Sequence, residues 1–190
     1  MNVEFLGSFT SESLPAQSYP EVAVAGRSNV GKTSFINALV ARRKVAHVSS
    51  KPGKTRTINL YLCNRDFVLA DLPGYGYSRA SKTERTRWAR DIETYLSRRV
   101  DLRATVLVID VRHFPMEIDL EALDWLSGLS RPVLAVFTKA DKLGRQELNR
   151  RRTDISGICA KHSIQYAIFS AKTGLGRKEV WNWIERTVHP

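Results

Sequence analysis

Short apolar runs alternate with segments of helical periodicity along most of the chain. The apolar runs predict strands at residues 21–25, 57–62, 67–70, 104–110, 132–138 and 166–169. Apolar side chains three and four positions apart predict helices at residues 34–40, 83–99, 119–129, 146–162 and 178–188. This order is typical of an α/β fold, in which helices cover both faces of a mostly parallel sheet.

One pair of predicted strands departs from this alternation. Only residues 63–66 separate the second strand from the third, which indicates a hairpin. We therefore expect a six-stranded sheet in which one antiparallel strand lies at an edge. Residues 1–20 mix polar side chains with Pro and Gly and predict an irregular lead-in. We see no internal repeat, low-complexity tract or linker in the sequence, and we interpret residues 21–190 as one domain.

The first predicted strand and helix flank the stretch GRSNVGKT, residues 26–33. It matches the phosphate-binding pattern G-x-x-x-x-G-K-S/T at every fixed position. Glycine lets the backbone N–H groups turn inward around a phosphate, and the helix N-terminus adds partial positive charge there. We expect Lys32 to reach the β- and γ-phosphates and the Thr33 hydroxyl to bind Mg²⁺. The alternative is a glycine turn before an ordinary helix.

Two acidic motifs follow other predicted strands, at the sheet end where ligands bind in such folds. Asp71 begins DLPG, where an aspartate can hold Mg²⁺ and the N–H of Gly74 can turn toward a γ-phosphate. Asp141 ends TKAD, and its carboxylate can accept two N–H groups that guanine offers and adenine lacks. Lys139 can lay its alkyl stem along the base. The alternatives are a plain turn and a helix-capping Asp.

The charge of the chain points to a further partner. Lys and Arg number 30 against 19 Asp and Glu, a net charge of +11. Bound nucleotide accounts for only part of it, so we expect nucleic acid or an acidic membrane face. The apolar runs are too short to span a bilayer, and we expect no signal peptide. Cys63 and Cys159 lack metal-ligand spacing, which is typical of core thiols in a reduced, intracellular protein.

The motifs occur in the order used by translation-factor-class GTPases. The chain resembles most closely the EngB-type family of bacterial GTPases (also called YihA or YsxC), which are small relatives of Era. The resemblance covers nearly the whole chain, and it is carried by Pro20-Glu21, GRSNVGKT, PGKTR at 52–56, DLPGYGY at 71–77 and TKAD at 138–141. It implies a Ras-like P-loop GTPase fold and the hydrolysis of GTP to GDP with Mg²⁺. It also implies a role in assembling the large ribosomal subunit, a link to cell division and septation, and a cytoplasmic location.

The resemblance also implies the site residues, position by position. They are the phosphate loop, a first switch at 53–57, DLPG, TKAD and a segment that lines the base. The implied nucleotide contacts are Gly26, Arg27, Ser28, Asn29, Val30, Gly31, Lys32, Thr33, Gly53, Lys54, Thr55, Arg56, Thr57, Asp71, Leu72, Pro73, Gly74, Thr138, Lys139, Ala140, Asp141, Phe169, Ser170 and Ala171. Lys32, Thr55 and Gly74 are implied in hydrolysis, and Thr33 and Thr55 as ligands of Mg²⁺.

Three positions qualify this assignment. Thr138 replaces the Asn of most GTPases, and we expect its shorter side chain to tie the loops together less firmly. Tyr75 stands where Ras has its water-orienting Gln, which predicts slow intrinsic hydrolysis that a partner stimulates. Asn29 occupies a position that related GTPases use to bind K⁺, so K⁺-stimulated turnover is a hypothesis. An Asn that stabilises its own turn is the alternative.

Arginine-rich segments are candidates for binding ribosomal RNA. A basic stripe beside Trp88 suits RNA phosphates, whereas the alternative is a solvated helix face with ion pairs. The candidate cations are Arg79, Lys82, Arg85, Arg87, Arg90, Arg98, Arg99 and residues 150–152. We expect a monomer that binds a large-subunit precursor. The other functions considered are a septation scaffold without direct RNA binding and a P-loop phosphotransferase.

Overall fold

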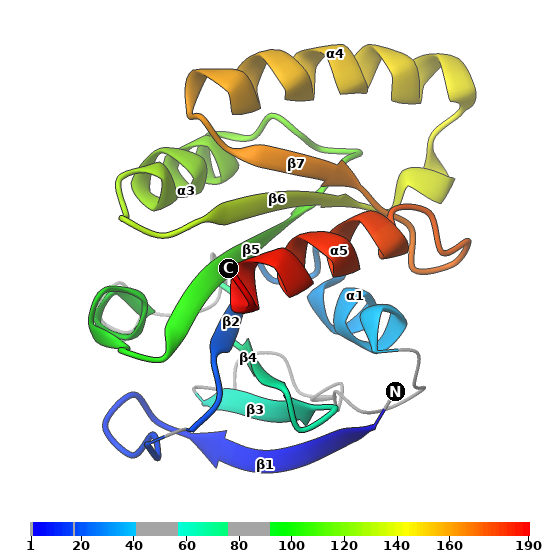
Figure 1. Ribbon diagram of the computed structural model, residues 1–190. Coiled ribbons are helices and arrows are strands. Elements are labelled where there is room, and N and C mark those ends of the chain that lie inside the picture. Colours follow the sequence, from blue (N-terminus) through cyan, green and yellow to red (C-terminus); the bar gives the residue numbers. More distant parts are fainter. Residues whose placement is uncertain (1, 17, 41–56, 76–91) are drawn as a thin grey trace.

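The computed structural model describes residues 2–16, 18–40, 57–75 and 92–190, and within these ranges one mixed sheet of seven strands lies between helices (Figure 1). The strands are β1 (Val3–Phe9), β2 (Glu21–Gly26), β3 (Ile58–Cys63), β4 (Phe67–Asp71), β5 (Leu102–Asp110), β6 (Val133–Thr138) and β7 (Gln165–Ile168). Their order across the sheet is β1-β3-β4-β2-β5-β6-β7. The helices are α1 (Lys32–Leu39), α3 (Glu117–Ser127), α4 (Arg145–Lys161) and α5 (Arg177–Val188), and residues 92–98 are also helical.

Strand directions confirm the α/β class. β4, β2, β5, β6 and β7 run parallel to one another, and β3 is antiparallel to its neighbours on both sides. Residues 63–66 form the expected hairpin turn, in which Asn64 and Arg65 have positive φ. Two expectations about the edge were wrong. The sheet has seven strands rather than six. The antiparallel strand β3 does not lie at the edge, because β1 pairs with its outer side.

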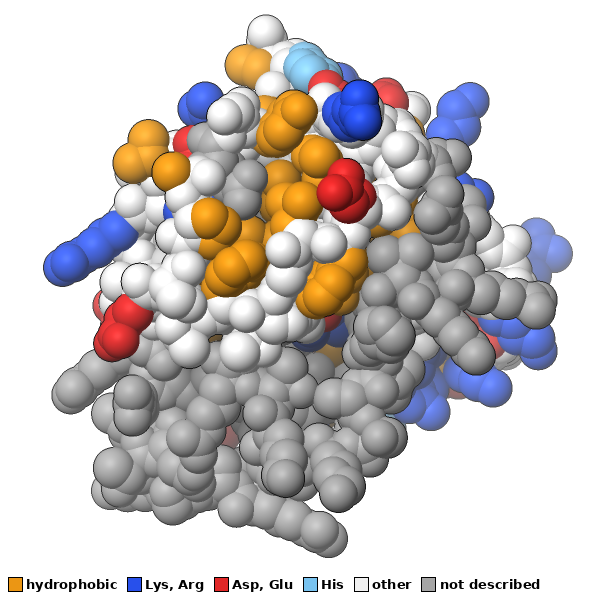
Figure 2. Space-filling view, turned by 90° about the horizontal axis from the view of Figure 1, so that it is seen from below, with side chains coloured by type: hydrophobic (Ala, Val, Ile, Leu, Met, Phe, Trp, Pro, Cys, Tyr) orange, Lys and Arg blue, Asp and Glu red, His pale blue; other side chains and the backbone are white. Residues whose placement is uncertain are grey.

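The strand β1 replaces the irregular lead-in that we expected over residues 1–20. Its register against β3 shifts between Phe5 and Gly7, and this bulge interrupts the alternation by which a strand is recognised. Gly7 has a φ of 143°, and a Cβ there would lie 2.8 Å from the ring of Phe9. The ring of Phe5 is half exposed and packs on Tyr61. Figure 2 shows hydrophobic side chains gathered on the side of the molecule where β1 lies.

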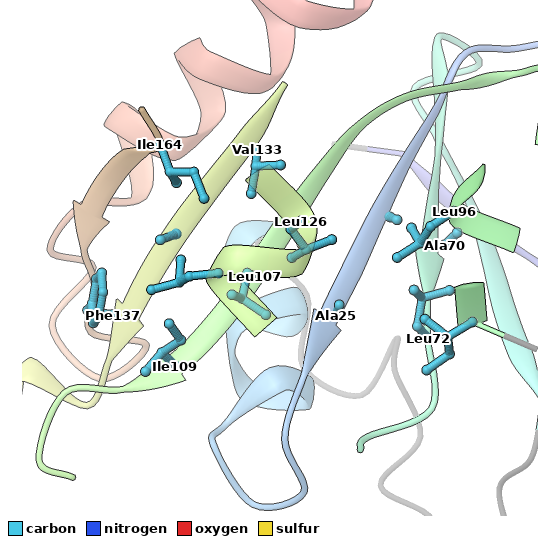
Figure 3. Packing of buried hydrophobic residues seen from close by; sticks show 14 of the residues in the cluster. Ala25, Ala70, Leu72, Leu96, Leu107, Ile109, Leu126, Val133, Phe137 and Ile164 are labelled. Atoms are coloured by element: carbon cyan, nitrogen blue, oxygen red, sulfur yellow. The ribbon is translucent and has the colours of Figure 1, made fainter. Parts of the chain in front are cut away.

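Two apolar layers hold the helices to the sheet. Alternate residues of β5 point to opposite faces, so Leu107 and Ile109 join one cluster while Val106 and Val108 join the other. The first cluster packs α3, α4 and helical residues 92–98 on one face. Figure 3 shows part of this cluster, with Leu126 of α3 beside Leu107 of β5. The second packs α1 and α5 on the other face. The expected helices are confirmed, except that most of the one at 83–99 lies outside the described residues.

A buried ion pair fixes helical residues 92–98 at the start of β2. Glu21 is fully buried and accepts hydrogen bonds from the Tyr95 hydroxyl at 2.9 Å and from the guanidinium of Arg99. Burial raises the pKa of Tyr95, and the charge of Glu21 raises it further. These hydrogen bonds hold the guanidinium of Arg99 against the buried Glu21. The prediction that Arg99 binds RNA phosphates was wrong.

Candidate functional site

The phosphate loop joins the carboxyl end of β2 to α1, as the sequence predicted. Asn29 and Gly31 take positive φ values of 68° and 97°, which curl the chain just before the helix. Gly26 must be glycine, because a Cβ there would lie 2.7 Å from the carbonyl oxygen of Val108 on β5. The loop therefore sits directly over the centre of the sheet, at the end of the parallel strands where ligands bind.

Lys32 and Asp71 meet at the mouth of this loop. The ammonium of Lys32 donates a hydrogen bond to Asp71 Oδ1, and the two side chains are only 13% and 9% exposed. This contact joins two predicted phosphate and metal motifs from different strands. The same contact is consistent with a Mg²⁺ site. The carboxylate of Asp71 already lies against a cation, the ammonium of Lys32, and Lys32 is next to Thr33 in the sequence. Among the described residues no group of three or more His, Cys, Asp or Glu side chains is placed to hold a metal ion.

The DLPG segment pairs with the phosphate loop through its backbone. The N–H of Tyr75 donates to Gly26 O at 3.2 Å, and the N–H of Ser28 donates to Tyr75 O at 3.0 Å. A Cβ on Gly74 would lie 3.2 Å from Ser28, so the two segments are in close contact. The Tyr75 hydroxyl is buried, and burial and the charge of Asp119 raise its pKa. This side chain turns inward, toward α3.

The TKAD segment grips the other side of the phosphate loop. The hydroxyl of Thr138 lies 2.6 Å from Val30 O and 3.0 Å from Ile109 O. Lys139 has a φ of 62°, and its ammonium donates to Asn29 O at 2.7 Å. We expected Thr138 to tie these loops weakly, but its hydroxyl reaches the phosphate loop directly.

Asp110 is a site residue that the sequence interpretation missed. It ends β5, and its buried carboxylate accepts hydrogen bonds from the guanidinium of Arg112 and lies 2.9 Å from the ammonium of Lys139. Burial raises the pKa of Asp110, but the hydrogen bonds from both cations outweigh it and lower the pKa to about 2. Asp110 thus holds Lys139 over the phosphate loop. Its place at a strand end, like that of Asp71, is the signal that could have identified it.

The two loops that we expect to contact the base are joined to each other. Ser170 Oγ donates to Asp141 Oδ1 at 2.7 Å, and this bond lowers the pKa of Asp141. The N–H of Ala140 donates to Phe169 O at 3.2 Å. The ring of Phe169 is buried edge-on against Phe35, with centroids 4.9 Å apart, so only its backbone is available to line a base.

The remaining predicted residues divide into three groups. The side chains of Val30, Leu72 and Ala140 are buried and leave only backbone groups for a ligand. Among the others that the structure describes, Pro73 is buried, Thr57 is partly buried and Ala171 is exposed. The structure does not describe the first-switch residues Gly53, Lys54, Thr55 and Arg56, nor the basic residues at 79–90.

The fold and the converging loops define a P-loop GTPase of the Ras-like class. A family model described as a 50S ribosome-binding GTPase matches residues 21–139. The chain belongs to the EngB family of GTP-binding proteins, whose members hydrolyse GTP. It is 43% identical to the probable GTP-binding protein EngB of Bacillus mycoides (strain KBAB4), with 92% of this chain and 89% of that protein covered.

Two further comparisons with EngB proteins support this assignment, and a third comparison shows the fold alone. The EngB protein of Lactiplantibacillus plantarum (strain ATCC BAA-793 / NCIMB 8826 / WCFS1) is 42% identical, with 97% of this chain and 94% of that one covered. A crystal structure of a probable GTP-binding protein EngB is 25% identical, with a TM-score of 0.71 and coverage of 89% and 98%. Era of Aquifex aeolicus bound to GDP and AlF₄⁻ is 24% identical with a TM-score of 0.71, covering 90% of this chain and 57% of that one, and it shares the fold.

Proposed function

We propose that this GTPase is a nucleotide-dependent switch in the assembly of the large ribosomal subunit, acting as a cytoplasmic monomer, and that normal septation depends on it. The observation that carries the proposal is a set of exposed arginines on α4 in a chain of net charge +11. The matching family model is described as ribosome-binding. Era, a relative in fold, has been crystallised with nucleotides of 16S ribosomal RNA. Among the described helices, none is both long and apolar enough to cross a bilayer.

The exposed cations on α4 do not include every arginine of the basic run at residues 150–152. Arg145, Arg150 and Arg152 are exposed. Arg151, between two of them, is half-buried and donates a hydrogen bond to the carbonyl oxygen of Phe114. We therefore propose that Arg145, Arg150 and Arg152 contact RNA phosphates and that Arg151 has a structural role. The face seen in Figure 2 is largely apolar at its centre where it is described, so it is a poorer candidate for RNA.

Co-sedimentation with large-subunit precursors tests the proposal. The protein is sedimented with GTP, GDP or a non-hydrolysable GTP analogue, and we expect binding to differ between the GTP analogue and GDP. The double variant Arg150→Gln/Arg152→Gln should bind more weakly and lower the salt slope by roughly two, because each phosphate contact releases about one counterion. Lys178→Gln/Arg186→Gln is the matched control, since it removes the same charge from exposed sites on α5, across the sheet.

Two results would contradict this assignment. Equal weakening by the α4 variant and the α5 control would mean that only net charge matters. Absence of precursor binding in every nucleotide state would instead favour a septation scaffold that does not bind ribosomal RNA.

We also propose that the nucleotide binds together with Mg²⁺. Thr33 and Thr55 are the proposed protein ligands, and Asp71 would help to hold the ion, partly through water. The ion would supply charge neutralisation at the β- and γ-phosphates. Lys32 exchanges the carboxylate of Asp71 for the phosphates, which leaves Asp71 free to face the cation. Calorimetry of GDP binding with and without Mg²⁺ should show weaker binding without the ion, and a larger Mg²⁺ effect in the wild type than in Asp71→Asn.

A further inference from the structure

The carboxylate of Asp119 is fully buried in the first turn of α3. Both of its oxygens lack a hydrogen-bond partner among the described residues. An acid at this position of a helix ordinarily faces the free N–H groups of the first turn, but here no side chain caps the helix. A buried, unpaired carboxylate destabilises a fold, so its presence calls for an explanation.

Within the described part of the chain, the cation that pairs with this carboxylate comes from the phosphate loop. Arg27 Nε lies 3.9 Å from Asp119 Oδ1, beyond hydrogen-bond length, and Nε itself has no acceptor among the described residues. Burial raises the pKa of Asp119, and the charge of Arg27 opposes this rise. The pair is therefore held by charge across a short gap, in surroundings where charge interacts strongly.

Tyr75 is the third member of this cluster. Its hydroxyl is buried, and the charges of both Asp119 and Arg27 act on its pKa. The backbones of Arg27 and Tyr75 also pair with each other as a parallel bridge. Side chains and backbone thus connect α3, the phosphate loop and the residue after Gly74. No nucleotide-binding motif of the sequence includes α3.

We propose that Asp119 is a positioning residue for GTP hydrolysis: by attracting Arg27 it fixes the phosphate loop against Gly74 and Tyr75. Without this attraction the side chain of Arg27, which is already 21% exposed, turns toward water. The backbone bridge between Arg27 and Tyr75 then loses its side-chain anchor. The loop keeps its affinity for nucleotide, because the motifs that hold phosphate and base are unchanged, but Gly74 is less well placed for the reaction.

The variant Asp119→Asn tests this role because it removes the charge and keeps the shape. We expect kcat for GTP to fall about tenfold or more, since a shift of about 1 Å in a reacting group can cost up to about a hundredfold. The dissociation constant for GDP should stay within about threefold of the wild type. The stability to urea should stay equal or rise, because a buried carboxylate without a hydrogen-bond partner in the ranges that the structure describes is replaced by a neutral amide while Arg27 turns toward water. A merely structural role would lower stability and rate together.

Variants of the partner make the test independent of how Asp119→Asn folds. Arg27→Gln should lower kcat to a similar extent, whereas Arg27→Lys, which keeps the charge, should retain part of the rate. The double variant Arg27→Gln/Asp119→Asn should be no slower than the slower single variant, because the two residues act as one unit. Asp124→Asn is the matched control on α3, where the side chain is 81% exposed, and its kcat should equal that of the wild type.

Three outcomes would overturn the proposal. The first is a wild-type kcat in Asp119→Asn or in Arg27→Gln. The second is a loss of rate in the double variant equal to the product of the two single losses. The third is a fall in kcat that parallels equal losses of GDP affinity and stability.

Discussion

Thr138→Val should loosen the hold of the TKAD segment on the phosphate loop. The substitution removes one hydroxyl and leaves the side-chain shape nearly unchanged. That hydroxyl lies 2.6 Å from Val30 O and 3.0 Å from Ile109 O, and the residue is 3% exposed. A hydroxyl has one proton and donates to one carbonyl at a time, so one hydrogen bond is lost.

The magnitude follows from the burial of this bond. A neutral hydrogen bond contributes about 1 kcal/mol, and a buried acceptor left without its donor costs about 1–3 kcal/mol. We expect the free energy of unfolding of Thr138→Val to fall by about 1–3 kcal/mol. Only the part of this energy that holds Val30 in place affects ligand binding. The affinity for GDP should therefore fall by at most roughly tenfold, which corresponds to about 1.4 kcal/mol.

Urea unfolding measures the first quantity and titration calorimetry with GDP the second. Thr138→Ser is the control, because it keeps the hydroxyl and should bind GDP as the wild type does. If Thr138→Val unfolds at the wild-type urea concentration and binds GDP equally well, the hydroxyl does not connect the two loops.

Asp110 should make stability depend on pH at the acid end. Its pKa in the fold is about 2 against an ordinary 3.8, so its contribution is present above about pH 4 and is lost as the pH falls toward 2. Asp110→Asn should flatten this part of a plot of urea midpoint against pH, and an unchanged plot would contradict the ion-pair assignment. Arg131→Ala should lower the free energy of unfolding by about 2 kcal/mol, because its guanidinium donates to backbone carbonyls of Leu96, Arg99 and Leu102, at the end of helical residues 92–98. Its GDP affinity should not change, since these contacts lie at the opposite end of the sheet from the phosphate loop, and a large loss of affinity would refute this separation. Hydrolysis in KCl and NaCl tests the K⁺ hypothesis, and equal rates would remove it.

The sequence predicted the parts of the fold that rest on local patterns. Six apolar runs became strands close to their expected bounds, because each is buried on both faces or paired within a hairpin. The strand β1 was missed because a bulge at Gly7 breaks its alternation and its partner β3 lies far along the chain. Glu21 shows a related limit. The resemblance included this residue, but its role depends on Tyr95 and Arg99, which only the fold brings to it.

The residues of the candidate site show the same difference between local sequence patterns and contacts that only the fold creates. Asp71 and Asp141 could be predicted because each sits in a short motif whose neighbours in the sequence share its task. Asp110 and Asp119 are single acids without such neighbours, and what distinguishes them is a cation supplied by another element of the fold. One cation, Lys139, belongs to TKAD, and the other, Arg27, belongs to the phosphate loop. The motifs therefore identify residues that we expect to contact the nucleotide, but not the acids that lie against them. An acidic residue at a strand end or in the first turn of a helix should therefore be checked in the folded structure for a cationic partner before it is interpreted as a solvated or helix-capping residue.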